Sequence, residues 1–157
     1  VLAMEEIARA SGRIVALTVG AEDLAVSMGM EPVADALYWP NVRAVACARA
    51  AGCLPIGYVG TVAEYADEAA YRQTAMRARR LGFEGGFCIH PSQVPILNEA
   101  FSPAVEEVAW ARGVMAAHDG AIAEGKGATV HDGKMIDQPV VDRARNILAR
   151  HATITSR

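Results

Sequence analysis

Three short apolar segments, each followed by a helical pattern, constrain the fold of this chain more than any other feature. They lie at residues 13–20, 54–60 and 85–90, and none alternates cleanly between apolar and polar positions, so each reads as a strand buried on both faces. Strands that alternate with helices at this spacing predict a parallel α/β sheet. No G-x-G-x-x-G motif follows the first segment, which leaves a dinucleotide-binding fold without support. The sheet could be an open doubly wound sheet or part of a (β/α)8 barrel.

Helical patterns lie between and after these segments, and two of them end at a glycine, as helices often do. We predict helices at residues 42–51, 64–81, 91–100, 103–124 and 138–151. Another helical pattern already runs through the first residues, without an initiator methionine or a signal-type segment before it. We therefore expect these residues to form part of a larger fold.

The composition predicts an ordinary soluble protein. The chain has 157 residues, of which 52% are hydrophobic and 21% charged, with a net charge of −3. It has no basic stripe and no apolar run of the ~20 residues that a membrane helix needs, so we expect neither nucleic acid nor a membrane as a partner. Cys47, Cys53 and Cys88 lack a metal-binding spacing and predict reduced thiols in a cytoplasmic protein.

Polar residues and glycines follow each predicted strand, where parallel strands usually carry functional groups. They are Gly-Ala-Glu-Asp at 20–23, a glycine-rich turn at 57–60, and His-Pro-Ser-Gln at 90–93. Together they predict either a complete functional site or one half of such a site. By spacing alone, Asp23 fits a helix N-cap better than a metal ligand. Asp137 stands directly before Gln138 and Pro139, where a helix begins, and also fits a helix cap.

Three stretches of the chain resemble characteristic segments of the citrate lyase β-subunit/malyl-CoA lyase family, also called the HpcH/HpaI aldolase–citrate lyase superfamily. They are TVGAEDLAVSMGM, GFEGGFCIHPSQVPILNEAFSPAVEEVAWA and GKGATVHDGKMIDQPVVDRARNIL. The resemblance implies a (β/α)8 barrel of roughly twice this length, of which the chain matches the C-terminal half. We expect residues 1–124 to be that half, with about three parallel strands, and residues 125–157 to be a C-terminal lid and helix.

The same resemblance implies an enzyme. The expected reaction is Mg²⁺-dependent, Claisen-type cleavage or formation of a carbon–carbon bond on acyl-CoA thioesters such as malyl-CoA or citramalyl-CoA. Asp23 matches the family's metal aspartate, whose partner glutamate would end a strand just before Val1. Asp137 matches the acid/base aspartate of a lid that closes over a neighbouring subunit, which implies a homo-oligomer, a trimer or hexamer. The glycines of residues 125–133 would let that lid move.

Further roles follow from the "cIHP" segment of the family. The resemblance implies that the backbone of Cys88 and Ile89 contacts the CoA moiety, while His90 shapes the strand end. The Cys88 side chain is expected to be a small buried group. Two departures leave the substrate open: Gly86-Phe87 stands where many members have a lysine nearby, and Gly57 where many have an acid.

Two alternatives remain beside the lyase. One is a malyl-CoA thioesterase, which would use the same metal and the same lid aspartate but water as the nucleophile. The other is a non-catalytic CoA-binding or assembly subunit, if the chain truly begins at Val1.

Overall fold

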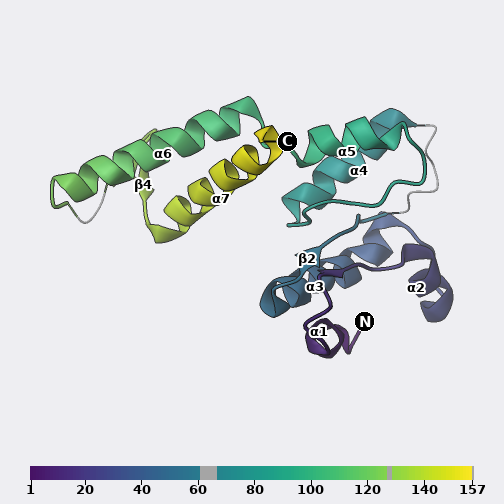
Figure 1. The fold of residues 1–157 in the computed structure, drawn as a ribbon. Coiled ribbons are helices and arrows are strands. Elements are labelled where there is room, and N and C mark those ends of the chain that lie inside the picture. The colour runs from purple at the N-terminus through teal and green to yellow at the C-terminus, as the bar shows by residue number, and fades with distance from the viewer. Residues whose placement is uncertain (61–66, 127–128, 157) are drawn as a thin grey trace. The chain divides into compact units, whose positions relative to one another are not determined.

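The computed structural model describes residues 1–60, 67–126 and 129–156 (Figure 1). The chain divides into two compact units, Val1–Phe101 and Ser102–Arg157. The sequence predicts a division between residues 124 and 125 instead. The boundary in the structure lies earlier in the sequence, because helix α6 (Val105–Ala123) packs against the last helix, α7 (Gln138–Thr155), and so belongs to the same unit.

A short parallel sheet organises the first unit. Strand β1 (Ala16–Leu17) pairs with β2 (Leu54–Pro55), and Ile56 forms a parallel bridge to Gly85. The predicted order and parallel sense of the strands are present, but the paired stretches are shorter than the predicted 13–20, 54–60 and 85–90. Apolar composition indicates burial, whereas a strand also requires a partner's backbone hydrogen bonds, which the local sequence does not specify.

The described part of the first unit also contains five helices. They are α1 (Met4–Arg9), α2 (Ala21–Met28), α3 (Ala34–Ala51), α4 (Glu68–Arg80) and α5 (Gln93–Phe101). Figure 1 shows α4 and α5 side by side, and their buried residues share one core cluster with Leu37 and Phe83. The Arg9 guanidinium donates to the carbonyl of Ala50, 2.8 Å away, and so ties α1 to the end of α3.

Helix α3 begins earlier than the sequence predicts. The sequence predicts the helix from residue 42, and proline, which lacks an amide proton, usually breaks a helix interior. The structure carries the helix through Pro40, and the Asn41 side-chain amide donates to the carbonyl of Leu37, 2.9 Å away. The helix ends as predicted at Gly52, which adopts the left-handed conformation.

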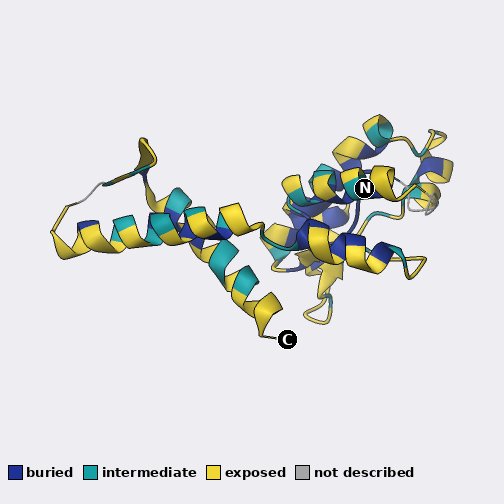
Figure 2. Cartoon of the chain, turned by 90° about the horizontal axis from the view of Figure 1, so that it is seen from above, coloured by how far each residue is buried: buried dark blue, intermediate teal, exposed yellow. Residues whose placement is uncertain are grey.

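The second unit is a pair of helices joined by a β-hairpin. Glu107 opens α6 by accepting a hydrogen bond from the Ala104 amide, 2.8 Å away. Strand β3 (Thr129–His131) then pairs antiparallel with β4 (Lys134–Ile136). Ile136 of β4 packs in one cluster with buried residues of both helices, which are Ala111, Val114, Val141 and Ala144. Figure 2 shows the hairpin largely exposed, so Ile136 is the residue that anchors it in this core.

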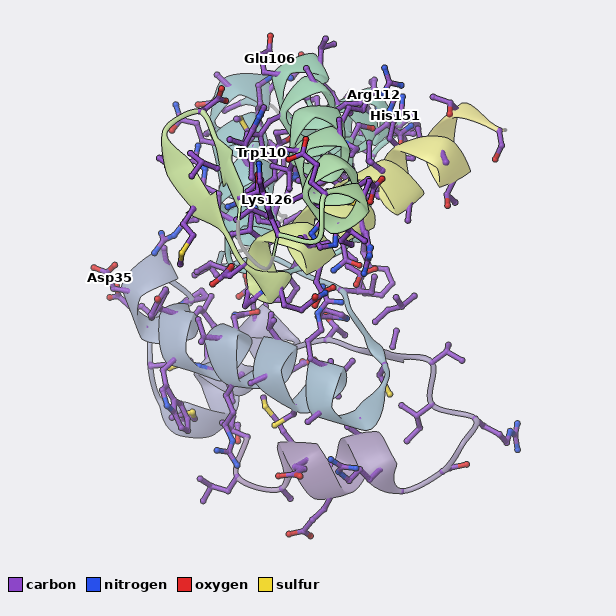
Figure 3. The ribbon with its side chains drawn as sticks, turned by 90° about the vertical axis from the view of Figure 1, so that its left-hand side faces the viewer. Asp35, Glu106, Trp110, Arg112, Lys126 and His151 are labelled. Carbon is purple, nitrogen blue, oxygen red and sulfur yellow. The ribbon has the colours of Figure 1, made fainter. Side chains whose placement is uncertain are left out.

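A cation–π contact adds to this packing on the surface. Trp110 lies on α6 (Figure 3), and the guanidinium carbon of Arg143, on α7, is 5.1 Å from the centre of its ring. Within the described residues, no helix is long and apolar enough to cross a membrane.

Candidate functional site

The parallel pairing of β1, β2 and Gly85 brings three chain segments to one edge of the sheet. Strands that run the same way end at the same edge, and here the chain leaves them towards Asp23, Tyr58 and residues 87–90. The sequence predicted this common edge from the order of strands and helices. The residues that follow β1, β2 and the third segment therefore lie at one edge of the sheet in the first unit.

Asp23 lies in the first turn of α2, and its side chain is exposed. The N-cap of this helix is Gly20, so the N-cap interpretation of Asp23 is wrong. The carboxylate lies close to Gly20: a Cβ placed on this glycine would be 3.1 Å from Asp23 Oδ2. A carboxylate in the first turn of a helix is stabilised by the helix dipole. Among the described residues, no group of three His, Cys, Asp or Glu side chains is placed to hold a metal ion.

Residues 87–90 leave the sheet with their side chains exposed. Phe87 is 59% exposed and Ile89 is 58% exposed. Cys88 is exposed too, which corrects the prediction that its side chain is buried. The reason is that strand pairing among the described residues ends at Gly85, so none of their strands pairs with the segment that follows. In the part of the chain that the structure describes, the backbone N–H and C=O of Cys88 make no hydrogen bond.

Two buried tyrosines lie beneath this segment. Tyr58 follows β2 and Tyr71 lies on α4, and their hydroxyl oxygens are 2.8 Å apart. Tyr58 Oη also donates to the carbonyl of Phe87 at 2.8 Å. Because a phenol has one proton, Tyr71 must donate to Tyr58. Burial raises the pKa of Tyr58 and of Tyr71 above the ordinary value of 10.0, so both phenols stay protonated.

Gln93 holds the segment from its other end. This side chain is only 1% exposed, and its Oε1 accepts hydrogen bonds from the amides of Ile89 at 2.8 Å and His90 at 3.2 Å. His90 Nδ1 lies 2.9 Å from the hydroxyl of Ser92, in agreement with a shaping role. Tyr58 and Gln93 lie within the segments 57–60 and 90–93 that the sequence predicts at a site, but no individual role was predicted for either. A glutamine in the first turn after a His-Pro step was the one available signal, and its burial could not be read from the sequence.

Asp137 belongs to the second unit, where it caps α7. Its Oδ1 accepts a hydrogen bond from the amide of Val140, 3.2 Å away, as the sequence predicts for an acid before Gln138 and Pro139. The carboxylate is exposed. It directly follows β4, so it stands at a corner between a strand and a helix.

The glycine-containing segment before Asp137 differs from the loop expected at residues 125–133, of which 127 and 128 lie outside the described residues. Gly125 ends α6 in the left-handed conformation, and Asp132 and Gly133 form the hairpin turn with φ values of 50° and 72°. Two central residues with positive φ define a type I′ turn. This hairpin was not predicted, although the Asp132-Gly133 pair between two short strands is a known hairpin signal.

Comparison with known proteins shows the family of this chain. A family model described as HpcH/HpaI aldolase/citrate lyase matches residues 1–91, more than half of the chain and nearly all of the first unit. The chain belongs to the HpcH/HpaI aldolase/citrate lyase family. This confirms the family that the three sequence segments indicated.

Curated relatives within the HpcH/HpaI family extend the match over the whole chain. The L-malyl-CoA/beta-methylmalyl-CoA lyase of Cereibacter sphaeroides is 35% identical over 172 residues, covering 98% of this chain and 53% of the relative. The citrate lyase subunit beta of Escherichia coli strain K12 is 37% identical over 147 residues, covering 92% of this chain and 48% of the relative. The chain thus spans about half the length of the curated relatives it matches.

Two solved structures have the same fold as this chain. CitE from Mycobacterium tuberculosis, crystallised with magnesium, acetoacetate and coenzyme A, matches with a TM-score of 0.79 at 31% identity over 95% of this chain and 56% of its own. A citrate lyase from Burkholderia xenovorans matches with a TM-score of 0.81 at 23% identity over 99% of this chain and 50% of its own. The predicted fold class, an α/β chain forming part of a (β/α)8 barrel, is confirmed.

Proposed function

We propose that the protein containing this chain is a magnesium-dependent acyl-CoA lyase, which breaks or forms a carbon–carbon bond of a hydroxyacyl-CoA thioester such as malyl-CoA. The observation that carries this proposal is the 35% identity to a malyl-CoA lyase over 98% of the chain. The magnesium and coenzyme A in the CitE crystals support the same cofactor and ligand class.

Asp23 is the residue that we assign to magnesium. Its carboxylate is exposed at the carboxyl edge of the parallel sheet, and Mg²⁺ is usually held by one or two carboxylates together with substrate oxygens and water. A single carboxylate from this chain fits such a site. When bound, magnesium would supply Lewis-acid polarisation of a substrate carbonyl oxygen.

Asp137 is the residue that we assign to proton transfer. Cleavage of malyl-CoA breaks the bond between the hydroxyl-bearing carbon and the carbon next to the thioester. The bonding electrons go to that second carbon, the hydroxyl group loses its proton as it becomes the aldehyde of glyoxylate, and the carbon takes up a proton to give acetyl-CoA. Asp137, as the carboxylic acid, delivers this last proton, and the proton that the hydroxyl group releases to water balances the one with which the carboxylate is reprotonated. In the reverse direction the Asp137 carboxylate removes a proton from the methyl carbon of acetyl-CoA. One of its oxygens, Oδ1, accepts the Val140 amide, so we assign the transfer to Oδ2.

The backbone of Cys88 and Ile89 is the part that we assign to coenzyme A. Both residues are exposed, and both lie at the same sheet edge as Asp23. A polar backbone in a fixed, exposed position can bind the amide groups of the pantetheine arm without a charged side chain.

The test is Asp137→Asn in the natural gene product that contains these residues. Asparagine is as good an N-cap as aspartate, so α7 keeps its start while the proton donor is lost. We expect turnover of malyl-CoA to fall by about 10²–10⁴-fold, with little change in affinity for CoA. The matched control is Asp132→Asn, which makes the same chemical change in the hairpin turn, five residues away, where asparagine tolerates positive φ.

Product analysis decides between the possible activities. Acetyl-CoA and glyoxylate from malyl-CoA identify the lyase, whereas malate and free CoA identify a thioesterase. An unchanged rate in Asp137→Asn would return this residue to a purely structural role as a helix cap.

A further inference from the structure

The segment at residues 87–90 is held at both ends by buried side chains, although its own side chains are exposed. At one end Tyr58 donates to the Phe87 carbonyl, and at the other Gln93 accepts the Ile89 and His90 amides. Tyr58 is 6% exposed and Gln93 is 1% exposed. Buried polar groups are costly unless they are hydrogen-bonded, and here the bonds that satisfy them also fix the backbone of the exposed segment.

The packing at residue 86 shows how closely the segment lies against Tyr58. A Cβ built on Gly86 would fall 2.0 Å from the Tyr58 hydroxyl oxygen and 2.1 Å from the ring carbon that bears it. Only a residue without a side chain allows the main chain to pass there. Tyr71 supports the same hydroxyl from behind, because its own hydroxyl donates to Tyr58. The position of the Phe87 carbonyl is therefore determined by two core residues, Tyr58, which follows β2, and Tyr71 on α4.

Backbone groups of Cys88 and Ile89 lie between the hydrogen bonds made by Tyr58 and Gln93. Among the residues that the structure describes, the N–H and C=O of Cys88 and the C=O of Ile89 make no hydrogen bond. Three polar groups are thus available to a ligand. They are held in place by neighbours on either side rather than by a sheet.

We propose that Tyr58 and Gln93 are positioning residues, which hold residues 87–90 so that the backbone of Cys88 and Ile89 is preorganised to bind the CoA part of the substrate. The proposal rests on the proposed function, since CoA is the ligand only if that function holds. Preorganisation lowers the conformational entropy that binding would otherwise cost. Because the two side chains act through the backbone of residues 87–90, the expected effect is on CoA affinity and on KM, not on kcat.

The two tyrosines provide a matched pair of variants. Tyr58→Phe removes the hydroxyl that holds the Phe87 carbonyl, whereas Tyr71→Phe removes a buried hydroxyl but leaves that bond in place. We expect Tyr58→Phe to weaken CoA binding, measured by titration calorimetry with free CoA, by roughly tenfold, the size typical of one lost hydrogen bond. Tyr71→Phe should stay within about twofold of the wild type. Equal losses in both variants, or none in Tyr58→Phe, would overturn the proposal.

A second measurement needs no variant. Amide hydrogen exchange of the natural protein, resolved to single residues, should show slow exchange at Ile89 and His90 in the absence of CoA, because buried Gln93 accepts both amides. The Cys88 amide should exchange quickly. Fast exchange at Ile89 and His90 would show that the segment is not anchored and would overturn the proposal even if Tyr58→Phe failed to fold.

The outcomes also separate this proposal from the proposed function. A wild-type protein that does not bind CoA contradicts the ligand assigned there, while slow exchange at Ile89 and His90 would still establish the anchoring. A wild-type protein that binds CoA, and binds it equally well as Gln93→Met, contradicts the positioning role alone. Methionine has nearly the shape of glutamine but no oxygen to accept the two amides.

Discussion

The hydroxyl groups of Tyr58 and Tyr71 lie in the hydrophobic core of the first unit, and each is part of one short chain of hydrogen bonds that ends at the Phe87 carbonyl. Such a chain is stable only while both phenols keep their protons, since a phenolate could not donate. Burial favours the same state, because it raises the pKa of both groups above 10.0. Packing and hydrogen bonding therefore act in the same direction.

This pair predicts a loss of stability in alkaline solution. In the unfolded chain the two phenols ionise near pH 10, whereas in the folded chain their raised pKa keeps them neutral. Below pH 10 both states are protonated and the stability is fully present. As the pH rises above 10 the unfolded state loses these protons before the folded state does, so the free energy of unfolding falls. Urea unfolding between about pH 8 and about pH 11 measures the slope.

A variant without one of the buried phenols is the control for this prediction. Tyr58→Phe should make the alkaline fall less steep, because it removes one of the two phenols whose pKa is raised by burial. The same slope in Tyr58→Phe as in the wild type would contradict the raised pKa of Tyr58.

At the level of single residues, the sequence predicted roles that depend on near neighbours in the chain. Asp137 was predicted at the start of a helix because Gln138 and Pro139 follow it, and it caps α7. Cys88 was expected to be buried because its segment is apolar, which was wrong, since the exposure of a residue depends on which elements cover it. The role of Gln93 depends on its burial and on its contacts with the Ile89 and His90 amides, which form only on folding and could not be predicted from its neighbours in the chain.

Among the elements, α6 and the β3–β4 hairpin lie in close contact. Gly113 lies on α6, and a Cβ built there would fall 2.3 Å from Cε1 of His131, at the end of β3. The hairpin therefore rests on a position of the helix that has no side chain. Glycine within a helix ordinarily costs about 0.5–1 kcal/mol relative to alanine, and at this position the cost is offset by the contact that it permits.

Two substitutions in the same helix test this contact. Gly120→Ala has open space around its new methyl group and should stabilise the protein by about 0.5–1 kcal/mol. Gly113→Ala must displace the His131 ring, and we expect it to be less stable than Gly120→Ala by about 1–3 kcal/mol in urea unfolding. Adding His131→Ala to Gly113→Ala should remove most of that difference. Equal stabilisation by both alanines would show that the ring moves aside without cost.

The elements were predicted with uneven success for a physical reason. Helices end where local signals stand, and Gly52 ends α3 as predicted. The strands were predicted too long, because pairing partners decide their length. The hairpin was missed because the glycines around it were interpreted as freedom to move, whereas Gly133 supplies the positive φ that a tight turn requires.

At the scale of the whole molecule, the two assigned acids lie in different compact units. Asp23 belongs to Val1–Phe101 and Asp137 to Ser102–Arg157. The family and the barrel fold could be predicted from three sequence segments, and both are confirmed. Which subunit's Asp137 serves which Asp23 could not be derived from one chain, because an exposed acid on a separate unit is compatible with either arrangement. We propose a homo-oligomer, a trimer or hexamer, in which the Asp137 unit of one subunit completes the site of its neighbour.

Mixed oligomers test this arrangement. Asp23→Ala and Asp137→Asn subunits should each be nearly inactive alone. When they are mixed in equal amounts and allowed to exchange, roughly a quarter of the sites should combine an intact Asp23 with a neighbour's intact Asp137, since half of the subunits carry each intact residue. Turnover of malyl-CoA should then recover towards one quarter of the wild-type rate. If both acids of a site came from one subunit, every site in the mixture would lack one of them. Absence of recovery, with subunit exchange verified by native mass spectrometry, would therefore assign both residues to the same subunit.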